Sequence, residues 1–332
     1  MFAQKENAFN AIRLFLCLVV VFMHTLGHFG VQNALLLDGH MAVCGFFIIS
    51  GFWITKSFLS SKNLKTFFFK RAKKILPMYY FSVIGFSILC VLFSSLNAKE
   101  YFSSPEYWKY LFWNCIFLNF AHPSLPSCFG GDAVNGALWT IKVEIGFYII
   151  LPLLMWIYEK LKTSTKQNIF FAVLYVLSVA YNLILQKYAT KLHLPAQLAH
   201  QLPGFISFFV AGMWIFLNYD LFYKIRNYLI FPSLLAYFAH YATKTEILFP
   251  AALAVIIVWC AVQFKAFDKV GREIDFSWGI YLFHFPIMQI LYYSIFQINT
   301  EKINAYLYAL CTLSLSFMLT YIVEKMSKKK MS

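Results

Sequence analysis

Residues 9–28, FNAIRLFLCLVVVFMHTLGH, decide the fold of this chain. The run is apolar and about as long as the roughly 20 residues that a helix needs to cross a bilayer, yet it contains Arg13 and His24. Ionisable side chains at membrane depth are costly, and they usually face a protein interior or a wet cavity and mark function. The two residues fall on nearly one helical face, about 16 Å apart along the axis. The stretch therefore predicts a spanning helix that presents a guanidinium and an imidazole to one internal cavity.

The composition extends this interpretation to the whole chain. Of 332 residues, 61% are hydrophobic and only 13% are charged, against about 25% charged residues in soluble domains. Apolar runs of membrane length recur throughout, which is typical of a multi-pass membrane protein. The formal net charge is +14, but the basic residues lie in short loops between the apolar runs. That placement is an orientation signal and argues against a nucleic-acid partner.

We expect an all-α polytopic membrane bundle that forms a single transmembrane domain over residues 1–332. Lysine and arginine are concentrated in the loops that share a side with the N-terminus, which predicts that both termini are cytoplasmic. The apolar runs indicate about ten transmembrane helices, over residues 9–28, 40–58, 75–95, 138–157, 168–187, 203–218, 228–242, 247–264, 276–296 and 304–323.

Residues 96–137 are expected to form an extracytoplasmic loop. Within it, residues 110–120 (YLFWNCIFLNF) are apolar but too short for a full span, so they predict an interfacial or re-entrant element. Cys115 and Cys128 both lie in this segment and are candidates for a disulfide if that side is oxidising. The other cysteines show no metal-ligand spacing, and no metal site is predicted.

Four short motifs occur in order along the chain. The first is the Arg13–His24 spacing, and the second is FFIISGF at residues 46–52. The third is LWTIKVEIGFYIILP at residues 138–152, and the fourth is SWGIYLFHFP at residues 277–286. In these motifs the chain resembles acyltransferase family 3, the integral membrane acyltransferases that modify bacterial surface carbohydrates.

The resemblance implies an O-acyltransferase of the bacterial inner membrane. It would move acetyl from cytoplasmic acetyl-CoA to a hydroxyl of an extracytoplasmic glycan, such as a lipopolysaccharide, O-antigen or other lipid-linked saccharide. Acetyl-CoA is expected as a co-substrate, with no tightly bound cofactor. Some family members carry an SGNH-type domain; this chain is expected to act without one, or with a separate partner in glycan assembly, among membrane lipids.

The predicted catalytic residues are His24, Arg13 and Glu144. A histidine can take the proton of an acceptor hydroxyl near neutral pH, or it can be transiently acylated. Arg13 is expected to stabilise negative charge on the donor, or to be a structural ion pair. Glu144 is expected to orient His24, to bind the acceptor or, less readily, to pair with Arg13. An acid near a helix N-terminus is the structural alternative for Glu144.

A basic segment, KRAKKILPMYY at residues 70–80, is similar to an R-x-x-R-I-x-P-x-Y pattern of the family. Arg71 matches the first arginine, whereas Lys74 replaces the second and offers a point charge instead of a planar fork. We expect Arg71 and Lys74 to bind the phosphates of CoA. The structural alternative is that they only set the orientation in the membrane.

Ser277, Tyr281 and His284 follow one another at spacings of four and three, so they share one helical face. They are expected to contact the substrates, together with Ser50 and the aromatic side chain of Trp139. Ser50 and Gly51 also allow a close helix approach. Buried histidines are often only hydrogen-bonded core residues, and that alternative stays open for His284.

A proton-coupled transporter or flippase is the alternative function. Arginine, histidine and glutamate inside the membrane also suit a substrate pathway. Release of CoA would separate the two functions, since a carrier moves its substrate without consuming a thioester.

Overall fold

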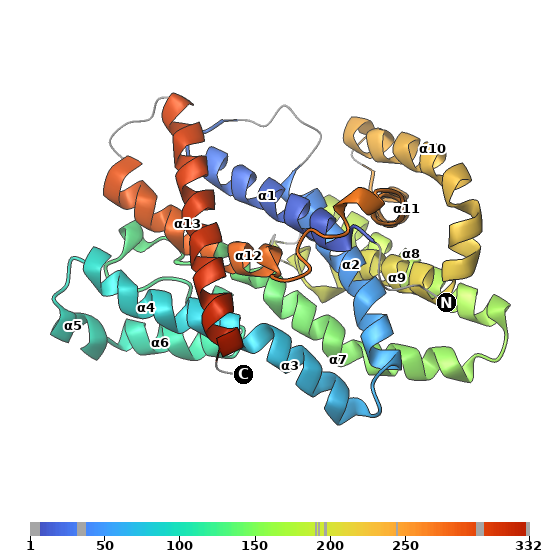
Figure 1. Cartoon of the computed structure of the whole chain (residues 1–332), viewed down its shortest axis with the longest axis horizontal. Helices are drawn as coiled ribbons and strands as arrows, with labels where there is room; N and C mark the ends of the chain where they lie inside the picture. Colours follow the sequence, from blue (N-terminus) through green and yellow to red (C-terminus); the bar gives the residue numbers. More distant parts are fainter. Residues whose placement is uncertain are drawn as a thin grey trace. The chain divides into compact units, whose positions relative to one another are not determined.

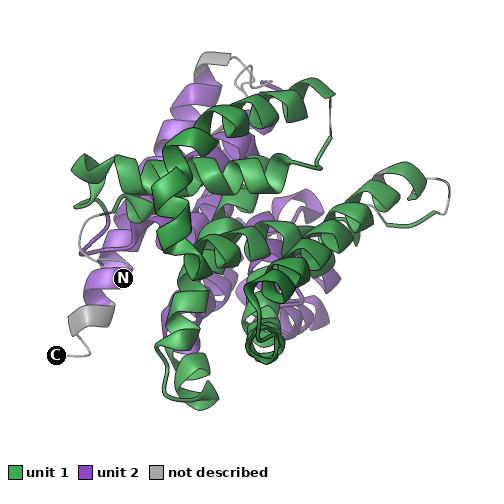
Figure 2. Ribbon diagram, turned by 90° about the vertical axis from the view of Figure 1, so that its right-hand side faces the viewer, with its two compact units in different colours: residues 1–12, 40–70, 143–270 green, residues 13–39, 71–142, 271–332 purple. Residues whose placement is uncertain are grey.

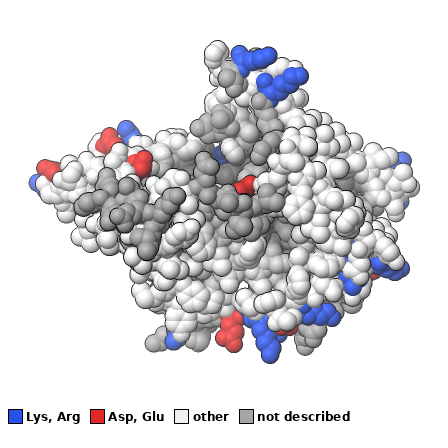
Figure 3. All heavy atoms as spheres, turned by 90° about the horizontal axis from the view of Figure 1, so that it is seen from above, with Lys and Arg blue, Asp and Glu red and all other residues white. Residues whose placement is uncertain are grey.

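The computed structural model describes residues 7–31, 38–189, 191, 193–195, 198–243, 245–296 and 302–329. The described residues are almost all helical and contain no strand beyond an isolated bridge between Ser94 and Cys128 (Figure 1). This confirms the all-α fold. Most of the face in Figure 3 carries neither basic nor acidic side chains, in keeping with the low content of charged residues.

Each predicted span corresponds to a helix. The corresponding helices are α1 (Phe9–Gly27), α2 (Gly39–Leu59), the run from α3 (Leu64–Tyr80) to Phe93, α7 (Trp139–Lys160), α8 (Ser164–Tyr188), α9 (Leu202–Leu217), α10 (Tyr219–Thr243), α11 (Phe249–Gln263), α12 (Phe276–Leu291) and α13 (Lys302–Lys329).

Fewer helices than the ten expected have the length and the apolar composition of a membrane span. Six helices in the described part are long and apolar enough to cross a membrane, or seven if the bent pair α9 and α10 counts as one span. The difference arises because α9, α11 and α12 have only 16, 15 and 16 residues, and because α10 qualifies only together with α9, across a bend of 112°. Two helices also begin earlier than predicted, at Leu64 and Tyr219, because their first turns are rich in charge and do not stand out as apolar.

The predicted loop at residues 96–137 is folded. It contains α5 (Ala98–Ser103), α6 (Pro105–Cys115) and three short 3₁₀ turns. Helix α6 has 11 residues, too few for a span. The suggested disulfide is absent: Cys115 and Cys128 are both free thiols, and buried Cys128 donates instead to the carbonyl oxygen of Cys90 at 3.4 Å.

The chain divides into two compact units, coloured in Figure 2. Unit 1 contains residues 1–12, 40–70 and 143–270, and unit 2 contains residues 13–39, 71–142 and 271–332. Each unit is therefore built from segments far apart in the sequence. The single-domain organisation stays a prediction.

In unit 1, α2 and α9 cross with their backbones in contact. A Cβ added at Gly51 would overlap the carbonyl oxygen of Phe209, and one added at Gly212 would overlap that of Ile48. Only glycine fits where two helix backbones approach so closely. The close approach expected from the FFIISGF motif is thus present, and it fixes the helix that carries Ser50.

In unit 2, α12 is held by polar side chains at a break in its own hydrogen bonding. Pro286 has no N–H, so the carbonyl oxygen of Leu282 lacks its usual helical donor. Asn135 Nδ2 donates to that oxygen at 2.8 Å, and Ser82 Oγ donates at 3.1 Å. Two distant segments are therefore anchored to the turn of α12 that contains His284.

This anchoring predicts a coupling between Asn135 and Pro286. Asn135→Ala should lower the free energy of unfolding by about 1 kcal/mol, because a buried carbonyl loses a donor. In a Pro286→Ala background the loss should be smaller, since the new N–H of residue 286 can donate to Leu282. Thermal unfolding of the four proteins in detergent measures this cycle. Equal losses in both backgrounds would contradict the explanation.

Candidate active site

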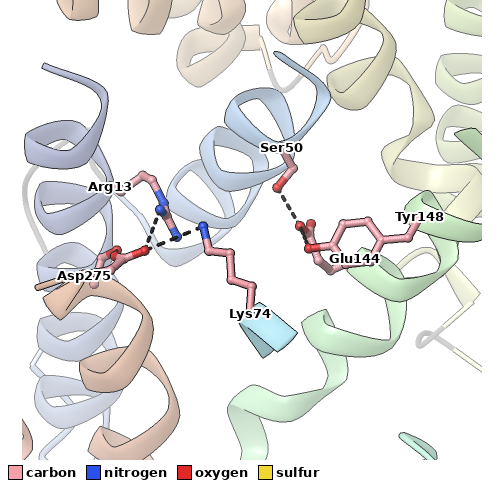
Figure 4. A network of polar contacts seen from close by, with 7 residues as sticks. Arg13, Ser50, Lys74, Glu144, Tyr148 and Asp275 are labelled. Atoms are coloured by element: carbon pink, nitrogen blue, oxygen red, sulfur yellow. Dashed lines mark hydrogen bonds and ion pairs between the residues drawn. The ribbon is translucent and has the colours of Figure 1, made fainter. Parts of the chain in front are cut away.

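Arg13 is neutralised by an acid that the motifs do not include. Its Nη1 lies 2.8 Å from Oδ2 of Asp275, the residue before α12, and Lys74 Nζ lies 3.7 Å from the same oxygen (Figure 4). Ser277 Oγ donates to Asp275 Oδ1 at 2.6 Å. Unit 2 thus brings together three predicted site residues, Arg13, Lys74 and Ser277, around one carboxylate.

The carboxylate of Asp275 is held ionised by its neighbours. The Arg13 side chain is 15% exposed, whereas that of Lys74 is 45% exposed. Burial alone would raise the pKa of the Asp275 carboxyl, but Arg13, Lys74 and the hydrogen bond from Ser277 together hold that pKa below its usual range. Two cations therefore face one carboxylate that stays ionised at neutral pH.

Arg71 lies one turn before Lys74 in α3 and is half-buried. Its Nε is buried and has no hydrogen-bond partner among the described residues. Arg71 is not part of the ion pairs around Asp275.

His24 and His284 form a hydrogen-bonded pair within unit 2. Nδ1 of His24 lies 2.9 Å from Nε2 of His284, and the two rings are nearly parallel, with centroids 5.2 Å apart. Nδ1 of His284 lies 2.8 Å from the carbonyl oxygen of Tyr281 and 3.1 Å from that of Ile280. His284 is fully buried, whereas His24 is half-exposed.

These contacts assign the protons of the neutral rings. A carbonyl oxygen only accepts, so Nδ1 of His284 must carry the hydrogen, and its Nε2 must be the acceptor. Nδ1 of His24 therefore donates to His284, which leaves the lone pair on Nε2 of His24. Within the described residues, Nε2 of His24 makes no hydrogen bond. The pair thus holds His24 in the tautomer of a base or nucleophile.

Tyr281, the third polar residue on this face of α12, has a local partner. Its hydroxyl lies 2.7 Å from Thr140 Oγ1 and donates to the Ala137 carbonyl oxygen at 3.3 Å. Tyr281 is buried, so it fastens the start of α7 to α12. Trp139, beside Thr140, is half-buried.

Unit 1 gathers Ser50 and Glu144. Oγ of Ser50 and the hydroxyl of Tyr148 both donate to Oε1 of Glu144 at 2.8 Å (Figure 4). Tyr148 lies four residues after Glu144, one turn along α7. That spacing in the sequence is the signal that the two side chains are neighbours on one helical face. Ser50 is thus a donor to a carboxylate. Within unit 2, Arg13 pairs with Asp275 and the Nδ1 partner of His24 is His284, and the roles expected for Glu144 stay predictions.

Asp275 was missed by the sequence reasoning. Two signals pointed to it: it comes two residues before the SWGIYLFHFP motif, and a buried arginine needs a counter-charge. His284, by contrast, was found by its motif, although its contact with His24 was not.

Comparison with known proteins gives a consistent result. A family model described as an acyltransferase domain matches residues 6–325. The chain is 24% identical over 319 residues to nodulation protein 10 of Rhizobium leguminosarum bv. viciae, covering 86% of this chain and 84% of that protein. It is 27% identical over 339 residues to an O-acetyl transferase of Shigella phage Sf6, covering 97% and 96%.

A third relative is the peptidoglycan O-acetyltransferase OatA of Listeria monocytogenes serovar 1/2a. Identity is 22% over 293 residues, which cover 75% of this chain and 45% of that protein. No solved structure matches the chain.

The ion pairs predict a role for Asp275 in stability. Asp275→Asn leaves Arg13 partly buried without a counter-charge, so the free energy of unfolding should fall by about 2 kcal/mol. Thermal unfolding in detergent measures the loss. Glu159→Gln, which removes an exposed acid from α7, is the matched control and should change the stability little. A stability loss no larger than that of the control would refute the role assigned to Asp275.

Proposed function

We propose that this chain transfers acetyl from acetyl-CoA to a hydroxyl of an extracytoplasmic envelope glycan. The chain belongs to the acyltransferase family and is therefore an acyltransferase. The sequence left a carrier as the alternative function, and family membership favours an enzyme over a carrier. The names of two relatives, an O-acetyl transferase and a peptidoglycan O-acetyltransferase, support acetyl as the group and a glycan as the acceptor. With its several apolar helices, this multi-pass membrane protein fits the bacterial cytoplasmic membrane.

One observation carries the chemistry: the lone pair of His24 Nε2, fixed by the hydrogen bond to His284. In the proposed reaction His24 takes the proton of the acceptor hydroxyl as its oxygen attacks the thioester carbonyl. The C–S bond breaks, an O-acetyl ester forms, and the proton passes to the thiolate of CoA. A transient acyl-imidazole would use the same lone pair. His284 is a positioning residue in either route.

The distance along α1 supports a long donor. Arg13 and His24 are about 16 Å apart along the helix axis. A donor whose phosphates bind beside Arg13 and Lys74 needs a flexible arm of that length to bring its thioester to His24. The pantetheine arm of acetyl-CoA meets this requirement, whereas a small donor such as acetyl phosphate does not. The two cations beside Asp275 are groups that bind the phosphates of CoA well.

The first prediction concerns His24 and His284. Envelope glycans from cells that express the wild-type protein should gain about 42 Da per acetyl ester, the product of base-assisted transfer. His24→Ala should abolish the gain, and His284→Ala should reduce it about a hundredfold, because the base loses its tautomer and orientation. Mass spectrometry of glycans from cells with each variant and with no protein provides the test. The same masses in all four samples, with expression confirmed, would refute the proposal.

The second prediction concerns the donor. Arg71→Ala and Lys74→Ala should each raise the KM for acetyl-CoA about tenfold in membrane vesicles, because each removes a cation from the phosphate contacts. The kcat should change little. Lys73→Ala, an exposed lysine between the two, is the control and should leave KM unchanged. If KM stays at the wild-type value in both variants, these residues do not bind CoA.

A further inference from the structure

A second group of side chains lies just beyond the ends of the two helices of unit 2 that carry the His24–His284 pair. His28 lies in the turn after α1, four residues after His24, and Tyr292 begins the π-helical turn after α12, eight residues after His284. With Asp132 and Tyr293 they form what we call the aromatic–acid cluster. None of these four residues belongs to the family motifs in the sequence.

The aromatic part of the cluster is a packed wall. The ring of His28 lies 4.8 Å from that of Tyr292, centroid to centroid. Behind them, fully buried Tyr308 lies 6.1 Å from His28 and 6.3 Å from Tyr292, and its hydroxyl donates to the Met288 carbonyl oxygen at 3.0 Å. His28 and Tyr292 are themselves only half-buried. Tyr308 thus supports both rings, which stay partly exposed.

The acid part is an exposed carboxylate held in a fixed place. Tyr293 donates its hydroxyl hydrogen to Oδ2 of Asp132 at 2.9 Å, and Oδ1 makes no hydrogen bond within the described residues. The ring of Tyr293 lies 5.3 Å from that of Tyr292, centroid to centroid, so the acid that Tyr293 holds lies next to the aromatic wall.

The loop that carries Asp132 is anchored to α12. Gln289 Nε2 donates to the Ala133 carbonyl oxygen at 2.9 Å, and Asn135 is bound to Leu282. Before Asp132 the chain turns through Gly130 and Gly131, both at positive φ. Phe129 also has a positive φ, of 49°, which a bulky residue rarely adopts. A strained, anchored loop that exposes a carboxylate fits a binding role better than a spacer.

We propose that the aromatic–acid cluster is a subsite for one sugar ring of the acceptor. The free oxygen of Asp132 would accept a hydrogen bond from a ring hydroxyl, while the ring of Tyr292, beside His28, covers the apolar C–H face of the sugar. Four residues, about the length of one helical turn, separate His24 in α1 from His28 in the turn that follows it. A ring held at the cluster therefore places a further hydroxyl within reach of the base.

This inference rests on the proposed function and has its own test. Purified full-length protein is given radiolabelled acetyl-CoA and one of three probes: the methyl glycosides of glucose, rhamnose and N-acetylglucosamine. Asp132→Asn and Tyr292→Ala should raise the KM for the acetylated glycoside about tenfold, with kcat and the KM for acetyl-CoA within twofold of wild type. Tyr292→Phe keeps the ring and should restore a KM near that of wild type.

Matched controls are Glu106→Gln, an exposed acid in the same loop region, and Tyr306→Ala, an exposed tyrosine in α13. Neither should change the KM for the glycoside. If Asp132→Asn fails to fold, Tyr292→Ala against Tyr292→Phe decides the question.

The outcomes separate the two proposals. Suppose that acetyl is transferred to a glycoside and that Asp132→Asn leaves the KM for the glycoside unchanged. This result overturns the subsite and leaves the proposed function standing. Where Asp132→Asn fails to fold, the KM of Tyr292→Ala is used in the same way. No transfer by the wild-type protein to any of the three glycosides counts against the proposed function, and the subsite falls with it.

Discussion

Under the proposed function, the chemistry depends on one hydrogen bond, which His284 Nδ1 donates to the carbonyl oxygen of Tyr281. That bond fixes the tautomer of a fully buried ring, and the ring in turn fixes the tautomer of His24. The arrangement resembles the role of the aspartate in a Ser-His-Asp triad, with a neutral imidazole in place of the carboxylate. An uncharged partner suits a membrane interior, where an unpaired carboxylate would be costly.

The position of His284 depends on the break that Pro286 makes in α12. An unsatisfied carbonyl in a membrane protein costs several kcal/mol, so a proline in such a helix must be compensated. Here Asn135 and Ser82 supply the missing donors to Leu282. The proline therefore gives α12 a polar attachment point for two distant segments. Because Leu282 lies between Tyr281 and His284, the same attachment limits movement of the His24–His284 pair.

The sequence alone predicted the local features well. Apolar run lengths located every predicted helix, and the motif residues His24 and His284 do contact each other. The sequence did not predict the ion-pair partner of Arg13. Asp275 is a single acid in a short loop, 262 residues from Arg13, and no helical periodicity connects the two. The suggested Cys115–Cys128 disulfide failed for a related reason, since proximity in sequence says nothing about where Cys128 is buried.

Three polar side chains in and just after helix α1 have surroundings that differ in kind. Arg13 is paired with Asp275 beside Lys74, His24 is bound to a neutral ring, and His28, in the turn after α1, packs on tyrosines near an acid. Under the proposed function, such a series would match three parts of one reaction: an anionic donor, a thioester that is attacked, and a neutral polyol. Arg13 cannot replace His24 as the base, because a guanidinium does not release its proton in proteins. In that reaction the donor and the acceptor would have to approach His24 along opposite directions of the same helix.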